Sequence, residues 1–160
     1  PVVLVADAEI AGHFQKYSTL GPLLAGVIET NPATMDPTRL HDAAYEVMQP
    51  RLERSRTEAV ERLEALLASR DPRAVTGIEV LVQAAHQGIV DTLLLTEDET
   101  AWGRYDEATG EVATREAFAT TGDDLLEAAA AQTLRHGGDV HVLPTGDMPD
   151  AAPAAAILRY

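Results

Sequence analysis

The chain of 160 residues contains no cysteine. This absence excludes disulfide frameworks, thiol nucleophiles and thiolate metal sites together, and it favours the cytoplasm. Aromatic residues are also scarce, at 4% of the sequence, whereas apolar residues make up 46%. No apolar run approaches the ~20 residues that span a bilayer, and the first ten residues do not resemble a signal peptide. We therefore expect a globular cytoplasmic protein with a core of alanine, valine and leucine.

Basic residues are few, with a single lysine, Lys16, and a formal net charge of −14. The imbalance is concentrated after residue 73, where fifteen acidic residues accompany four arginines. Affinity for nucleic acid comes largely from lysine and arginine that neutralise phosphates, so this chain is poorly suited to bind RNA over a broad surface. We expect a protein partner and no direct RNA binding.

The hydrophobic pattern predicts an α/β chain. Residues 2–7 and 22–31 are expected to form strands around a helix over 7–18, so the chain would start with a β-α-β piece. Asp36-Pro37 has the residue types of a helix cap and first turn, and Pro50 is expected to interrupt or kink the helix that follows.

The remaining pattern predicts two helices, a hairpin and three strands. The two helices are expected over roughly 77–87, where Gly88 ends the first, and over 120–138. The hairpin is expected over 101–115. The three strands are expected over 88–97, 139–144 and 151–160. This order implies an α/β/α sandwich with a mostly parallel mixed sheet covered on both faces. The sheet core is expected to contain Leu93, Leu95, Val140, Val142, Ala156 and Leu158.

A cluster of carboxylates, Glu97 to Glu99, follows the strand Leu93-Leu94-Leu95. Many α/β enzymes place acidic groups at such a strand end, and His136 or His141 would be possible further metal ligands. The alternative reading is an ordinary strand that meets solvent. Asp123-Asp124 is interpreted as part of a first helical turn, where negative charge complements the helix dipole. No phosphate-binding glycine loop and no G-x-S-x-G elbow occurs.

Two stretches resemble a known family. DPRAVTGIEVLVQAAHQGIVDTLLLTEDE, over 71–99, is similar to a helix and strand in the third domain of archaeo-eukaryotic class-one release factors and of Pelota. The family pattern there is Y-G-x-x-E-V-x-x-A-x-x-x-G-A-V-x-x-L-L-I-S-D. The end of the chain, AAILRY, is similar to the terminal G-I-A-A-I-L-R-Y of that domain. The matched residues are Gly77, Val80, Gly88, Val90, Asp91, Leu93, Leu94, Asp98 and the closing 155–160.

With its alanine-rich composition and its hairpin, the chain most resembles the bacterial release-factor-like family. The resemblance implies the fold of kink-turn-binding ribosomal proteins over 33–160, preceded over 1–32 by the last β-α-β piece of a central domain. The Asn-Glu pair and the lysine that bind kink-turn RNA align with Glu79, Val80 and Gln83, so the RNA-binding residues are missing. The Gly-Gly-Gln motif of peptide release is also absent, and the resemblance implies no catalytic residue, metal or cofactor.

The sequence therefore predicts a non-catalytic, ribosome-associated interaction domain that acts in translation rescue or hibernation. The alternatives are a small metal- or carboxylate-dependent hydrolase that uses Glu97, Asp98 and His141, and a homo-oligomeric structural module. Trp102, Arg104 and Tyr105 are the candidate partner-binding residues, because tryptophan, tyrosine and arginine are enriched at binding hot spots. The competing reading is that Trp102 packs on its own domain.

Overall fold

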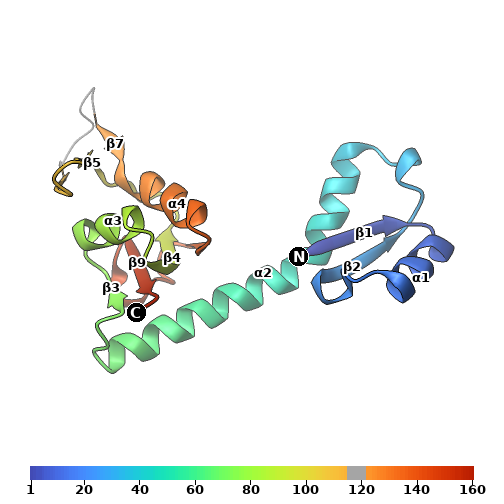
Figure 1. Ribbon diagram of the computed structural model, residues 1–160, viewed down its shortest axis with the longest axis horizontal. Helices are drawn as coiled ribbons and strands as arrows, with labels where there is room; N and C mark the ends of the chain where they lie inside the picture. Colours follow the sequence, from blue (N-terminus) through green and yellow to red (C-terminus); the bar gives the residue numbers. More distant parts are fainter. Residues whose placement is uncertain (115–121) are drawn as a thin grey trace. The chain divides into compact units, whose positions relative to one another are not determined.

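The computed structural model describes residues 1–114 and 122–160. These residues form two compact units, Pro1–Arg56 and Thr57–Tyr160, and Figure 1 shows the elements of each. Over the described residues, no helix is both long and apolar enough to cross a membrane.

The first unit contains β1 (Val2–Ala6), α1 (Ala8–Tyr17), η1 (Gly21–Leu23), β2 (Leu24–Glu29), η2 (Pro32–Thr34) and the beginning of α2 (Pro37–Ala68). β1 and β2 pair in parallel, as a connection through a helix requires. The predicted β-α-β piece is thus confirmed. Asp7 begins α1, because its carboxylate accepts a hydrogen bond from the Ile10 N–H at 2.9 Å.

The helix α2 begins as predicted, since the Asp36 carboxylate accepts from the Thr38 N–H at 3.0 Å. Of the two effects expected of Pro50, the interruption is wrong, because α2 is one helix of 32 residues with Pro50 inside it. The kink stays a prediction. A proline inside a helix removes one N–H donor and costs about 3 kcal/mol. Helix-favouring residues flank it, and Gln49 Nε2 donates to Glu53 Oε1 at 3.0 Å across it, so the helix continues.

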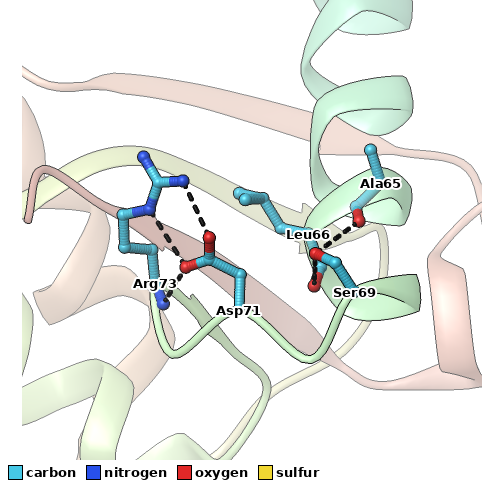
Figure 2. Close-up of polar contacts among 5 residues, drawn as sticks. All are labelled: Ala65, Leu66, Ser69, Asp71 and Arg73. Atoms are coloured by element: carbon cyan, nitrogen blue, oxygen red, sulfur yellow. Dashed lines mark hydrogen bonds and ion pairs between the residues drawn. The ribbon is translucent and has the colours of Figure 1, made fainter.

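Local hydrogen bonds close the C-terminal end of α2 (Figure 2). Ser69 Oγ donates to the carbonyls of Ala65 and Leu66, each at 3.0 Å. The Arg73 guanidinium then donates through Nε and Nη2 to the two carboxylate oxygens of Asp71, at 3.0 and 2.8 Å. These hydrogen bonds from Arg73 lower the pKa of Asp71 to about 2. The pair fixes the turn from the helix into the sheet.

The second unit contains the rest of α2 and two sheets. Its elements are β3 (Ala74–Val75), α3 (Ile78–His86), β4 (Val90–Thr96), β5 (Trp102–Tyr105), β6 (Val112–Thr114), β7 (Asp123–Asp124), α4 (Leu125–Arg135), β8 (Asp139–Leu143), η3 (Pro149–Ala151) and β9 (Ala154–Leu158). The larger sheet has the order β3-β9-β4-β8, and the smaller one the order β6-β5-β7.

Helices cover both faces of the larger sheet. Successive side chains of a strand point to opposite faces, and Leu93 of β4 accordingly packs with α3 and α4 while Leu94 packs with α2. Ala156 and Ile157 of β9 are divided in the same way. The α/β/α class predicted from the sequence is therefore confirmed.

The expectation of a mostly parallel sheet needs correction. β4 and β8 are parallel, because α4 lies between them in the chain, but β9 is antiparallel to both of its neighbours, β4 and β3. The connection from β8 to β9 contains only the short η3, whereas a parallel return needs a crossover long enough for a helix. The sheet is thus mixed, with two antiparallel pairs and one parallel pair.

The predicted sheet core is largely correct. Leu93 and Ala156 are fully buried, and Leu95, Val140 and Leu158 are partly buried against the same cluster. Val142 is wrong, since 49% of it is exposed. It lies in β8, which is an edge strand with a neighbour on one side only.

Candidate interaction surface

The predicted hairpin is present over the residues that the structure describes, and residue 115 lies outside them. β5 and β6 pair antiparallel, with Arg104 opposite Ala113 and Tyr105 opposite Val112. In the turn, the Asp106 carboxylate accepts hydrogen bonds from the N–H groups of Thr109 and Ala108 at 3.1 and 2.8 Å, which lowers the pKa of Asp106. The same carboxylate thus holds the turn together.

One face of the hairpin, which we call the inner face, packs on the helices of its own unit. A Cβ added at Gly103 would lie 2.5 Å from the Ala113 carbonyl oxygen of β6 and 2.5 Å from Leu125 Cδ1 of α4, so only glycine permits both approaches. Tyr105 stacks on His86 of α3, with ring centroids 3.7 Å apart and an interplanar angle of 18°. Gln83 Nε2 donates to the Gly110 carbonyl at 2.8 Å. These contacts fix the position of the hairpin on α3 and α4.

His86 is kept neutral by this packing. Its Nε2 atom is buried without a hydrogen-bond partner among residues 1–114 and 122–160. Burial lowers the pKa of His86, and the charge of His136 lowers it further, whereas the carboxylate of Glu107 raises it. A protonated ring would place a second N–H donor in a site that lacks an acceptor for it. The stack on Tyr105 therefore favours the neutral imidazole.

The outer face of the hairpin carries Trp102 and Arg104. Because side chains alternate along a strand, these two residues lie opposite the inner-face residues Gly103 and Tyr105. Trp102 is half-buried and Arg104 is exposed. The structure thus brings two of the three candidate partner-binding residues together and places Tyr105 on the other face. Period-two alternation was the signal in the sequence that would have separated them.

The strand β7 ties the hairpin to α4. Asp124 Oδ1 accepts from the Leu126 N–H at 3.0 Å, so it caps α4, and from the Ala101 N–H at 3.3 Å. Asp123 pairs with Gly103 in β7. The placement of Asp123 in a first helical turn is therefore wrong, because the helix begins after Asp124. Residues 120 and 121 of that predicted helix lie outside the described residues.

The carboxylates of Glu97 to Glu99 lie at a solvent-exposed strand end. The Glu97 N–H donates to the Leu143 carbonyl at 2.8 Å, and Asp98 has a positive φ of 62°, which turns the chain away from β4. His141 is half-buried in β8 opposite Leu94. Over residues 1–114 and 122–160, no group of three histidine, aspartate or glutamate side chains could hold a metal ion.

The terminal arginine has a role that the sequence did not reveal. Arg159 Nη1 donates to the Gly88 carbonyl at 3.0 Å, and Nη2 donates to the His136 carbonyl at 2.8 Å. Gly88 follows α3 and His136 follows α4, so one guanidinium satisfies a carbonyl at the end of each helix. The predicted left-handed conformation of Gly88 is confirmed by its φ of +72°. A Cβ there would also lie 2.8 Å from His136 Cδ2.

The family described as "Bacterial archaeo-eukaryotic release factor family 3" matches residues 1–89. This match covers more than half of the chain, including the first unit, the whole of α2 and α3. No curated protein sequence matches the chain.

Solved structures with a similar fold come from archaea and yeast. The C-terminal domain of a peptide chain release factor from Methanosarcina mazei is 19% identical with a TM-score of 0.57, and the match covers 79% of this chain and 97% of that one. Pelota from Archaeoglobus fulgidus is 13% identical with a TM-score of 0.48, and Saccharomyces cerevisiae Dom34 is 16% identical with a TM-score of 0.48. Each covers 99% of this chain, which spans 48% of the Pelota chain and 46% of the Dom34 chain.

Proposed function

This chain belongs to bacterial archaeo-eukaryotic release factor family 3, and we propose on that basis that it is a non-catalytic, C-terminal interaction domain of a ribosome-associated protein. The protein would act in translation rescue or hibernation, in the cytoplasm. The fold supports this proposal, because 79% of the chain matches the C-terminal domain of the Methanosarcina mazei release factor.

The proposed division of the chain is a closing β-α-β piece of a central domain over 1–32 and a third-domain-like part over 33–160. Burial in the first unit supports it. β1 and β2 form a parallel sheet of only two strands, and Ala6 is their one fully buried residue. Parallel sheets are normally covered on both faces, and two strands alone are marginally stable. We therefore infer that further elements of a central domain pack against this sheet and cover its exposed residues.

The outer face of the hairpin is the proposed contact with a ribosomal or translation-associated protein. The observation that carries this proposal is that Trp102 and Arg104 share that face, while inner-face contacts fix the hairpin in place. Tryptophan and arginine dominate many protein interfaces, and a rigid support lowers the entropy lost on binding. Tyr105 would contribute from the inner face by holding the hairpin.

Co-sedimentation of the chain with bacterial ribosomes tests the proposal. We expect association that changes little between ~50 and ~200 mM salt, because protein contacts release few counterions. A chain that stays in the supernatant at every salt concentration would contradict ribosome association. Binding that falls by several orders of magnitude over this range would instead indicate phosphate contacts and contradict the proposed protein contact.

A further inference from the structure

The first unit contains a pocket of about 370 Å³ between β2 and α2. Its lining residues are Leu24, Ala25, Val47, Pro50, Arg51 and Arg54. All six belong to the first unit, and none of them takes part in the contacts that support the hairpin. Pockets of roughly 300–1,000 Å³ suit small organic ligands.

Two backbone irregularities meet at this pocket. The pairing of β1 with β2 passes from Val2 opposite Leu24 to Val3 opposite Gly26, so Ala25 is skipped at a β-bulge. On the other wall, Pro50 has no N–H, so the carbonyl four residues before it lacks its usual helical donor. Bulges are frequent beside binding sites because they redirect the chain.

Two arginines give the pocket its charge. Arg51 and Arg54 lie three residues apart on α2, which places them next to each other on the helix surface, and both are exposed. Among the residues that the structure describes, no acidic side chain lines the pocket. The nearby Glu53 carboxylate accepts a hydrogen bond from Gln49. The pocket is thus locally positive in a chain whose net charge is −14.

We propose that this pocket binds the phosphate group of a mononucleotide. The arginine fork matches the oxygens of a phosphate and binds it with charge-assisted hydrogen bonds. Leu24, Val47 and Pro50 offer an apolar wall on which the base or sugar would pack. A phosphate of single-stranded RNA presents the same chemistry from another source. This site is separate from the proposed hairpin contact, so either proposal can fail without the other.

Calorimetric titration of the whole chain with adenosine monophosphate tests the site. We expect saturable binding of adenosine monophosphate and no binding of uncharged adenosine. Arg51→Gln and Arg54→Gln should each weaken binding at least about tenfold, because each removes a charge-assisted hydrogen bond to the phosphate. Arg39→Gln is the matched control, since Arg39 is an exposed arginine of α2 outside the pocket lining.

A parallel titration with single-stranded oligoadenylate distinguishes the two sources of phosphate. If the oligonucleotide binds in place of the mononucleotide and both pocket variants abolish this binding, the site is assigned to RNA phosphate. Shifts of the Ala25 amide and of the Arg51 and Arg54 Nε–H resonances on binding would place the ligand in the pocket. Binding of neither probe, or binding that Arg39→Gln weakens as much as Arg51→Gln, would overturn the proposal. Ribosome co-sedimentation of the same variants should remain unchanged.

Discussion

The two compact units are built from the same kinds of element, but they bury their apolar residues to different extents. Of the twenty buried hydrophobic residues among those described, only Ala6 and Ala11 lie in the first unit. Six of the ten exposed large hydrophobic residues lie there, namely Ile10, Tyr17, Leu20, Leu23, Tyr45 and Leu52. Local signals therefore suffice to form strands and helices in both units, whereas a dense core requires helices on both faces of the sheet, as in the second unit.

The units also differ in charge. The first unit has seven acidic and five basic residues, and the second has nineteen acidic and seven basic ones. The large negative charge of the second unit repels phosphate groups, so this unit is unsuited to bind nucleic acid over a broad surface. It is compatible with a protein partner. The weak charge of the first unit leaves its arginines available to an anion. This comparison is consistent with the protein contact that we propose for the second unit and with the anion site that we propose for the first.

The largest difference should appear when a core leucine is truncated. Leu93 is fully buried in the second unit, so Leu93→Ala should lower the free energy of unfolding by about 2–5 kcal/mol through the lost burial and the cavity. The matched variant in the first unit is Leu4→Ala in half-buried β1, which should have a clearly smaller effect. Urea denaturation measures both. Equal losses would contradict the comparison of the two cores.

The next largest effect is expected when Gly26 is replaced, because this glycine makes the one tight contact of the first unit that only glycine permits. A Cβ at Gly26 of β2 would lie 2.5 Å from Val47 Cγ1 of α2. We expect Gly26→Ala to destabilise this unit by about 1–3 kcal/mol, as overpacking does. The double variant with Val47→Ala should recover part of the loss, because it removes the clashing methyl. Additive losses in thermal melts would show that the two residues do not contact each other.

The inner face of the hairpin should loosen in acid. Burial lowers the pKa of His86 below its ordinary value of 6.5, so the folded state binds its proton less readily than the unfolded state. The contribution of the neutral ring is therefore complete above pH 6.5 and declines as the pH falls below it. Fluorescence of Trp102, the one tryptophan, should report the change. His86→Phe keeps a ring on Tyr105 without a titrating group, and it should remove this pH dependence.

The smallest effect concerns the half-buried pair Asp71 and Arg73, which follows the end of α2. Hydrogen bonds from Arg73 lower the pKa of Asp71 from 3.8 to about 2. Its contribution to stability is present above pH 3.8 and is lost as the pH falls toward 2. An NMR titration of the Asp71 carboxyl group should show this low midpoint, and Arg73→Gln should return it toward 3.8. A midpoint that stays low in the variant would contradict the role of Arg73.

Features that depend on neighbours in the sequence were predictable. Asp36 caps α2 and Gly88 ends α3 with a positive φ, because both follow from the chemistry of a single residue and its immediate context. The hairpin and the α/β class were predictable for the same reason, since turn residues and hydrophobic period are local signals.

Features that depend on distant partners were not predictable. The place of β9 between β3 and β4 depends on pairing with distant strands, and the exposure of Val142 depends on the position of β8 at the sheet edge. Arg159 contacts carbonyls that lie 71 and 23 residues earlier in the chain, and no local pattern identifies them. Period-two alternation separates Trp102 from Tyr105 locally, but which of the two faces packs on α3 and α4 depends on distant contacts.

The ribosome affinity of Trp102→Ala tests the central claim, that the outer face of the hairpin recognises a partner while the inner face is scaffold. We expect this variant to associate at least about tenfold more weakly than the unaltered chain, as truncation of a hot-spot residue does, with little change in melting temperature. Leu134→Ala, which removes another exposed apolar side chain of the same unit, is the control and should associate normally. Normal association of Trp102→Ala together with a lowered melting temperature would contradict the claim and make the outer face scaffold as well.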